Sequence, residues 1–259
     1  MLPVFQIHLF DIAVISVPAY GLFAILGAFF AMILSYFRVQ RLDFSFKRFL
    51  LMVGIIVLGC VLGSKALYIL TELPKIIEGF TVQKTLQIIW TSGFVFYGGL
   101  LGAIGALRVF ARMTHIPFHE LSCIVTPAFP LFHAIGRIGC FFAGCCYGIQ
   151  NSWGIAMAND PDILRIPVQL FESLTEFTIF LTLLLIEKGS QKASPNLLCA
   201  YLVMYSLCRF FLEFLRGDLI RGIWIFGLST SQIISILIFA IICVYIFRNR
   251  FSSSFESTV

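Results

Sequence analysis

The sequence predicts an all-α integral membrane protein, because it is strongly apolar, contains few charged residues and has uncharged runs long enough to cross a bilayer. Of its 259 residues, 59% are hydrophobic and 12% are charged, and the mean hydropathy is +0.97. Charged residues make up about a quarter of an average soluble protein. A soluble fold of this size could not cover so much apolar surface, whereas a membrane protein leaves it in contact with lipid.

The charged residues are spaced so that about seven helices can cross a membrane. Residues 12–37, 85–107 and 222–247 carry no charged side chain, and each run exceeds the roughly 20 residues that a spanning helix needs. Helices are expected because a span in lipid must satisfy its own backbone hydrogen bonds. Four further spans contain ionisable residues, and we place them at 49–71, 121–143, 169–186 and 195–215. We predict that residues 1–259 form a single transmembrane domain.

The basic residues predict the orientation of these spans, because cytoplasmic connections are enriched in Lys and Arg. One set of alternate connections carries ten basic residues, namely Arg38, Arg41, Lys47, Arg48, Arg108, Arg112, Lys188, Lys192, Arg248 and Arg250. The other set carries five, namely Lys75, Lys84, Arg165, Arg216 and Arg221. We therefore expect the N-terminus outside and the C-terminus in the cytoplasm. The net charge of +5 reflects this bias and does not indicate nucleic acid.

The N-terminal residues and one connection between the spans carry further signals. The first ten residues contain no Lys or Arg, so we expect no cleavable signal peptide and retention of the first span. Residues 144–168, on the predicted outer side, are rich in Gly, Asn, Asp and Pro and read as a true loop. Such a loop could cover a site that opens toward the outer leaflet.

Ionisable residues inside a span are costly and are therefore candidates for function. Six such residues occur here: Lys65, Arg137, Glu172, Glu176, Arg209 and Glu213. The basic members suggest an anionic ligand, because a guanidinium group binds phosphate through a planar fork of donors. A phospholipid headgroup is an anion found at this depth. The alternative is structural, since Arg209, Glu213 and Tyr205 share one helix face and the first two could simply neutralise each other.

Residues 133–148 combine glycines, a histidine and an arginine. The glycines would let a ligand or a neighbouring helix approach the backbone closely, and in membrane helices they often serve packing alone. His133 lies one helical turn before Arg137. A neutral imidazole there could accept a proton, or it could serve only as a structural hydrogen-bonding group.

The eight cysteines divide into two groups. Five lie in apolar runs and are expected to be small buried residues: Cys60, Cys123, Cys199, Cys208 and Cys243. Cys140, Cys145 and Cys146 are clustered. An adjacent pair has poor geometry for chelation and no second paired cluster follows, so we predict no metal and no cofactor. A disulfide in an oxidising outer compartment, or a nucleophilic thiol, stays open.

These residues, in this order, resemble the prolipoprotein diacylglyceryl transferase family across most of the chain. The matching segments are Ala19-Tyr20-Gly21-Leu22; Gly63-Ser64-Lys65 with Tyr68; Phe96-Tyr97-Gly98-Gly99-Leu100; Gly136-Arg137-Ile138-Gly139 through Gly148; Pro167-Val168-Gln169-Leu170-Phe171-Glu172-Ser173; Tyr205 with Arg209-Phe210 and Glu213-Phe214-Leu215-Arg216; and Gly227-Leu228-Ser229 with Gln232. The chain departs from the family pattern at four of these positions. It has Lys65 for Arg, Tyr97 for His, Cys140 for Asn and Cys145 for Glu.

The resemblance implies an enzyme of the bacterial cytoplasmic membrane. Members of the family move the diacylglyceryl group of phosphatidylglycerol to the lipobox cysteine in the signal peptide of a prolipoprotein. This first step of lipoprotein maturation forms a thioether, releases glycerol phosphate and needs no metal.

The resemblance also implies roles for individual residues. Arg137 and Arg209 would hold the phosphate, Lys65 would assist, and Glu213 would orient Arg209. Gln169 and Glu172 would position the headgroup or the peptide. His133 or Tyr97 would be the base or relay, and we favour His133 because the pKa of tyrosine is about 10. The remaining expected site residues line the site or permit close approach: Tyr20, Gly98, Gly99, Gly136, Gly139, Cys140, Cys145 and Tyr205.

Two other functions fit the same residues. The chain could transfer lipid to a different acceptor or carry it transiently on a cysteine, as the three clustered thiols suggest. It could also be a phospholipid-binding or transport protein without catalysis. The absence of an internal repeat in the sequence weighs mildly against a transporter built from duplicated halves.

Overall fold

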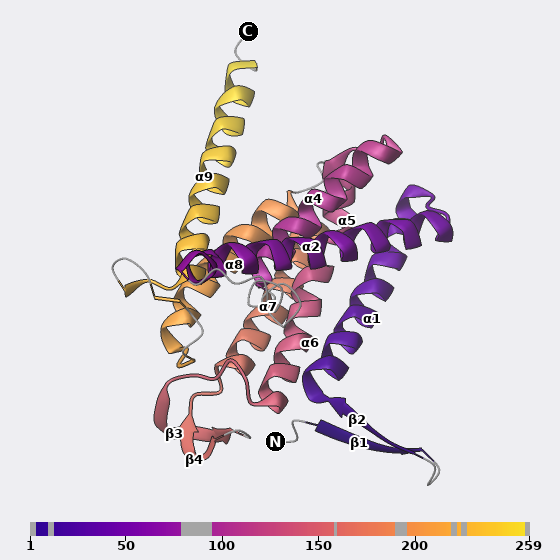
Figure 1. Ribbon diagram of the computed structural model, residues 1–259. Coiled ribbons are helices and arrows are strands. Elements are labelled where there is room, and N and C mark those ends of the chain that lie inside the picture. Colours follow the sequence, from indigo (N-terminus) through magenta and orange to yellow (C-terminus); the bar gives the residue numbers. More distant parts are fainter. Residues whose placement is uncertain are drawn as a thin grey trace. The chain divides into compact units, whose positions relative to one another are not determined.

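The computed structural model describes residues 4–9, 13–78, 95–157, 160–189, 196–218, 222–223 and 227–256, which are mainly helical (Figure 1). The helices are α1 Ala19–Val39, α2 Phe46–Glu78, α4 Phe96–Thr114, α5 Phe118–Val125, α6 Ala128–Ala143, α7 Val168–Gly189, α8 Leu197–Leu212 and α9 Thr230–Glu256, with short 3-10 helices η1 Gln40–Leu42 and η2 Glu213–Leu215. Two antiparallel hairpins complete the described elements. They pair β1 Val4–Leu9 with β2 Ala13–Pro18, and β3 Gln150–Met157 with β4 Asp160–Arg165.

Six stretches of the described chain are long and apolar enough to cross a membrane. They are Ala19–Leu42, Phe46–Leu73, Phe118–Ala143, Val168–Gly189, Leu197–Leu215 and Thr230–Arg248. Each overlaps one predicted span, so the predicted all-α membrane class is confirmed. The count of seven and the orientation stay predictions.

Two helices begin later in the chain than the uncharged runs that predict them. The run that starts at residue 12 begins as strand β2, and helix α1 starts only after Pro18. The run that starts at residue 222 becomes helical at Thr230, behind a reciprocal cap. Gln232 N–H donates to Ser229 Oγ (3.3 Å), and Ser229 N–H donates to Gln232 Oε1 (2.9 Å). This capping box fixes where the helix begins, a signal that hydropathy does not contain.

Two other predicted spans differ in detail. Residues 85–94 of the predicted span 85–107 lie outside the described residues, and helix α4 continues past Arg108 and Arg112 to Thr114. Basic residues are favourable near a helix C-terminus, so they do not end it. The predicted span 121–143 is interrupted between α5 and α6. Pro127 explains the break, because proline has no N–H and disfavours a helical conformation in the residue before it.

The chain forms two compact units, residues 36–124 and residues 1–35 with 125–259. In the first unit, α2 and α4 touch backbone to backbone. A Cβ atom added to Gly102 would overlap the carbonyl oxygen of Gly59, and one added to Gly98 would overlap that of Gly63. Membrane helices commonly pack through such small residues. Gly98 and Gly99 were predicted to admit substrate, and in the structure α2 fills the space beside both.

Within the same unit, Arg38 joins the end of α1 to the end of α5. Its Nε donates to the carbonyl oxygen of Ile124 (2.8 Å) and its Nη2 to that of Cys123 (2.9 Å). A helix leaves its last carbonyl groups without partners, and a cation there satisfies them.

The second unit holds α6, α7, α8 and α9. The Ser173 hydroxyl in α7 donates to the Ala134 carbonyl in α6 (2.8 Å), and Gln232 Nε2 in α9 donates to the Phe210 carbonyl in α8 (3.3 Å). These bonds tie neighbouring helices together at residues close to the ionisable side chains. The unit therefore fixes the helices that carry the candidate site.

We predict that Gly102→Ala destabilises the protein, because the new methyl group would force α2 and α4 apart. The expected cost is about 1–3 kcal/mol, measured as a lower unfolding temperature in detergent. The matched control is Gly105→Ala on the same helix, where an added Cβ meets nothing within 4 Å. It should stay within about 1 kcal/mol of the wild type. Equal behaviour of the two variants would contradict this helix contact.

Candidate active site

The centre of the candidate site is a buried carboxylate between two arginines on three helices. Arg209 Nη1 of α8 donates to Glu172 Oε1 of α7, and Arg137 Nε of α6 lies 2.9 Å from Glu172 Oε2. These side chains belong to residues that are at most 8% exposed. An unpaired charge would cost several kcal/mol in such surroundings. Pairing through Glu172 therefore holds α6, α7 and α8 in one arrangement.

Arg209 is engaged on its other side as well. Its Nη2 lies 2.6 Å from Glu213 Oε2 and donates to Ser231 Oγ at 3.3 Å. The internal pair with Glu213 that the spacing suggested is present, and Glu172 shares the same guanidinium group. Both terminal nitrogens of Arg209 are thus used within the protein.

His133 and Glu176 extend the network behind Arg137. Arg137 Nε donates to His133 Nε2 at 3.1 Å, and His133 Nδ1 lies 3.0 Å from Glu176 Oε1. Because Nε2 acts as the acceptor, we assign the ring proton to Nδ1. The lone pair that a general base would use is therefore occupied by Arg137.

The terminal nitrogens of Arg137 differ from its Nε in their contacts. None of the described residues accepts a hydrogen bond from its terminal nitrogens Nη1 and Nη2, while Nε is held by His133 and faces Glu172. A guanidinium group fixed at one edge presents its other edge as a fork for an oxyanion. The geometry therefore favours Arg137 over Arg209 as the direct anion-binding group.

A cavity about the size of one water molecule lies within the network. Its lining residues are His133, Glu172, Thr175, Glu176, Tyr205, Cys208, Arg209 and Leu212. The Tyr205 ring lies 5.8 Å from the His133 ring, centroid to centroid. The cavity is too small for a lipid headgroup, so an anionic headgroup would have to meet Arg137 from its unpaired edge.

The loop after α6 is anchored at several main-chain positions. Gly148 N–H donates to the Ile166 carbonyl (3.0 Å) and Ile149 N–H to the Leu215 carbonyl (2.9 Å). Gln169 Nε2 donates to the Cys145 carbonyl at 2.7 Å. Gln169 was predicted to position the headgroup, and in the structure it is fully buried and holds this loop. The loop is thereby fixed close to the end of the membrane span.

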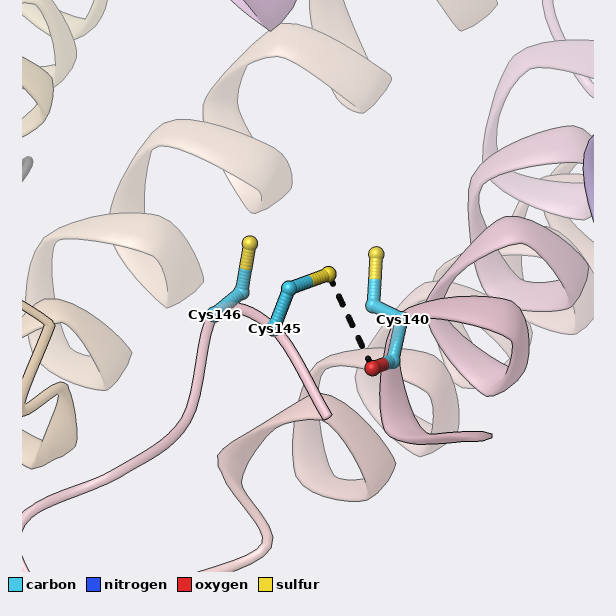
Figure 2. Close-up of side chains that lie close together, drawn as sticks. All are labelled: Cys140, Cys145 and Cys146. Atoms are coloured by element: carbon cyan, nitrogen blue, oxygen red, sulfur yellow. Dashed lines mark hydrogen bonds between the residues drawn. The ribbon is translucent and has the colours of Figure 1, made fainter. Parts of the chain in front are cut away.

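The sulfur atoms of Cys140, Cys145 and Cys146 all lie within 4.8 Å of one another (Figure 2). Cys140 lies in the last turn of α6, and the other two follow Gly144, which has a φ of 68°. Cys146 itself has a φ of 56°, a left-handed conformation that is uncommon for a side chain with a Cβ. This backbone brings the adjacent thiols to the same side. The adjacent pair, which was expected to have poor geometry for chelation, thus lies with both sulfur atoms close to that of Cys140.

The electrostatic setting makes one of these thiols acidic. Hydrogen bonds from the Cys140 and Cys145 thiols, with the charges of Arg137 and Arg216, lower the pKa of Cys146 despite its burial. The hydrogen bond with Cys140 lowers the pKa of Cys145, but its contact with Cys146 and its burial outweigh this and raise it to about 11. Of the two thiols after α6, Cys146 is therefore the one whose surroundings favour the thiolate form.

Other predicted site residues lie in both units. Tyr20 lies in the first turn of α1 and is 53% exposed, and Gly139 is the point where α6 meets α1 at Phe23. Lys65 and Tyr97 belong to the unit of residues 36–124, where the Lys65 ammonium lies 5.3 Å from the centre of the Tyr68 ring and Tyr97 is buried.

Two residues that complete the network, Ser231 and Asp218, were not predicted from the sequence, and Glu176 was a candidate without an assigned partner. Ser231 contacts Arg209. Asp218 accepts two hydrogen bonds from Arg216, at 2.9 and 2.6 Å. Glu176 faces His133, and its position four residues after Glu172 was the available signal, because this spacing puts both carboxylates on one helix face.

Comparisons with known proteins agree on one family. A family model described as prolipoprotein diacylglyceryl transferase matches residues 7–248. The phosphatidylglycerol–prolipoprotein diacylglyceryl transferase of Clostridium tetani is 30% identical over 246 residues, covering 93% of this chain and 96% of the relative. The Clostridium perfringens protein of that name, numbered 2, is 31% identical with 90% and 91% covered. The Polynucleobacter asymbioticus protein is 33% identical with 82% of each chain covered.

We predict that Cys146 and Cys145 react with an alkylating reagent over different pH ranges. The thiolate is the reactive form, so the lowered pKa of Cys146 should keep its alkylation rate high well below the usual cysteine pKa of about 8.5. Cys145 should react faster as the pH rises toward about 11. The measurement is peptide mass spectrometry of reduced, chelator-treated protein in detergent.

Two variants of Cys140 provide the control for this titration. Cys140→Ala removes a hydrogen-bond donor to the Cys146 thiolate and should shift the reaction of Cys146 to higher pH, whereas Cys140→Ser keeps a donor and should shift it less. If Cys145 and Cys146 titrate together near the ordinary value in all three proteins, the described cluster is not formed.

Proposed function

We propose that this chain, which belongs to the prolipoprotein diacylglyceryl transferase family, transfers the diacylglyceryl group of phosphatidylglycerol to a cysteine thiol of a prolipoprotein. The observation that carries the proposal is Arg137, a buried guanidinium group held at one edge and without a described partner at the other. The proposal is also supported by relatives that carry this activity in their names and that align with this chain over nearly their whole length. The lipobox cysteine of the signal peptide is the proposed acceptor.

The proposed reaction replaces a carbon–oxygen bond by a carbon–sulfur bond. The acceptor sulfur attacks the glyceryl carbon next to the phosphate, and the electron pair of the broken bond leaves with the phosphate oxygen as glycerol phosphate. Donors aimed at the leaving phosphate stabilise the charge that develops there. Arg137 is the proposed donor, because its Nη1 and Nη2 have the fork geometry that a phosphate needs.

The other network residues are proposed to position Arg137. Glu172 and His133 fix its Nε edge, and Arg209 neutralises Glu172 from the opposite side. Glu213 and Ser231 hold Arg209 in turn. Positioning of this kind lets the donors meet the transition state without further reorganisation.

The predicted site residues of the unit of residues 36–124 keep the roles that the resemblance implies. We propose that Lys65 assists in binding the anionic donor and that Tyr97, like Tyr20 and Tyr205, lines the path of the substrate. The family model spans residues of both units, which supports one functional domain. Gly98, Gly99 and Gly139 are proposed to contribute through helix packing, as their backbone contacts suggest.

A covalent relay on a cysteine of the chain is not proposed. Alkylation of Cys145 or Cys146 by the donor would form a thioether, whose carbon–sulfur bond a second thiol could break only by expelling a thiolate. The phosphate of the donor is the better leaving group. Direct transfer to the acceptor therefore needs fewer difficult steps.

The chain is a multi-pass protein of the bacterial inner membrane, and we propose that its site opens toward the outer leaflet. The support is the bias of basic residues and the position of Cys145 and Cys146 directly after the membrane span that ends at Ala143. The acceptor and the donor headgroup would both reach Arg137 from that side.

We predict a cytoplasmic C-terminus. A fluorescent protein fused after residue 259 should fluoresce, and an alkaline phosphatase fused at the same point should be inactive. In intact spheroplasts, a membrane-impermeant maleimide should label the Cys145–Cys146 pair. An active phosphatase fusion together with protected thiols would reverse the proposed orientation.

We predict that Arg137→Ala lowers kcat/KM by at least about 100-fold, the usual cost of losing one transition-state donor. Arg137→Lys should retain a small part of the activity, because an ammonium group keeps the charge without the fork. The measurement is the mass of a reporter prolipoprotein, in cells depleted of their own diacylglyceryl transferase and with purified protein.

The matched control is Arg112→Ala, which removes an exposed arginine near the end of α4. It should leave transfer unchanged. Unfolding temperatures of all three variants separate loss of function from loss of fold. Full lipidation by a folded Arg137→Ala protein would remove this arginine from the mechanism.

A further inference from the structure

The three clustered thiols have the separation of ligands around a metal ion. Their sulfur atoms lie within 4.8 Å of one another. Zinc–thiolate bonds of about 2.3 Å in a tetrahedral site place two sulfurs about 3.8 Å apart. Small rotations of the side chains would therefore bring all three to bonding distance. Soft thiolate ligands select Zn²⁺ or Cu⁺ over Mg²⁺ and Ca²⁺.

The backbone that carries the thiols is rigidly held. Cys140 belongs to α6, and the Cys145 carbonyl is fixed by buried Gln169. Main-chain bonds join the following residues to two other segments, from Gly148 to Ile166 and from Gly217 to Tyr147. Cys146 is kept in a left-handed conformation, a strain that persists only where the surroundings over-determine it. Such support is what a preorganised ligand set requires.

The charge around the cluster also suits a metal–thiolate complex. Three thiolates and one divalent ion leave one negative charge. Arg137 and Arg216 both act electrostatically on Cys146, and Arg216 is itself buried. Cys140 is buried while Cys145 and Cys146 are half-buried, so the cluster can be reached from one side.

The ligand set is incomplete for a closed structural site. Structural zinc sites use four protein ligands, whereas sites with three keep a position for a substrate or water. Among the described residues, no further His, Cys, Asp or Glu joins the three sulfurs. An ion bound here would have an open position, and Arg137 lies three residues before Cys140 on the same helix.

We propose that Cys140, Cys145 and Cys146 bind a thiophilic metal ion, Zn²⁺ in the first instance, and that its open position takes the acceptor thiol. The inference rests on the proposed transferase function. It supplies the group that would remove the proton from the acceptor thiol. The reaction needs a thiolate, His133 is occupied by Arg137, and Tyr97 is a weak base at neutral pH because the pKa of tyrosine is about 10. A thiol that coordinates zinc loses its proton outright.

The proposed step is balanced without an oxidant or reductant. Metal binding releases the protons of the ligand thiols to water, and the acceptor thiol loses its proton on coordination. Its sulfur electron pair then forms the bond to the glyceryl carbon, while the phosphate leaves with the electrons of the broken carbon–oxygen bond. The metal keeps its charge throughout.

The first experiment measures metal binding itself. Reduced protein is purified anaerobically in detergent, stripped with a chelator and titrated with Zn²⁺, or with Co²⁺ as a coloured substitute. We expect one ion per chain by elemental analysis and a thiolate-to-cobalt charge-transfer band. The triple variant Cys140→Ser, Cys145→Ser, Cys146→Ser should lose both signals. The control Cys243→Ser, which changes an exposed thiol on α9, should keep both.

The second experiment tests the open position. A synthetic lipobox peptide with its cysteine is added to the cobalt-loaded protein, and the visible cobalt bands should shift. The same peptide with serine in place of cysteine should cause no shift. In parallel, chelation should abolish diacylglyceryl transfer, and Zn²⁺ but not Mg²⁺ should restore it.

The outcomes separate this proposal from the proposed function. If the reduced wild type binds no ion, the metal site is overturned. This holds also for protein that was purified with a disulfide in the cluster and then reduced. Undiminished transfer by metal-free protein overturns its role while the transferase function stands. If the wild type binds one ion per chain and the triple variant binds none, the metal site is supported. If that same wild type transfers no diacylglyceryl group, the proposed function is overturned. Binding without a peptide-dependent shift overturns the open position.

Discussion

The arrangement of the second unit depends on one buried carboxylate between two guanidinium groups. Glu172 on α7 contacts Arg137 on α6 and Arg209 on α8. Lipid offers no water to solvate an unpaired ion, so each of these charges needs an opposite charge beside it. The rotation of three helices about their own axes is fixed by this requirement. It also decides which edge of Arg137 is engaged inside the protein and which has no partner among the described residues.

The same helix links this ion network to the thiol cluster. Arg137 and Cys140 are three residues apart on α6, so both lie on neighbouring parts of one helix face. The helix ends at Gly144 in a left-handed conformation, and the chain returns Cys145 and Cys146 toward Cys140. The proposed donor for the leaving phosphate and the proposed metal-binding thiols are thus set by the same short segment. On that proposal, the cysteines that stand where the family pattern has Asn and Glu take part in the chemistry.

The glycines illustrate how one residue type serves different ends in this chain. Gly98 and Gly102 permit α4 to touch α2, because the atoms of α2 leave no room for a Cβ at either position. Gly148 lies where a Cβ would meet the carbonyl oxygens of Ile166 and Leu215, so it allows the loop to close against two other segments. Gly144 supplies a positive φ at the end of α6. The sequence pattern indicates only that small residues are needed, because the partner of each glycine comes from a distant segment.

The sequence by itself determined the membrane class and six of the spans, because hydropathy and charge act locally and need no knowledge of contacts. It also identified Arg137, Glu172, Arg209 and Glu213, since an ion within an apolar run is costly wherever its partner lies. The tertiary structure decided how these ions pair, that the lone pair of His133 is occupied, and that Gln169 holds a loop. It also decided that adjacent cysteines converge with a third. Each of these features depends on the backbone conformation and on residues from other helices. The spacing of residues along the chain encodes neither of these two causes.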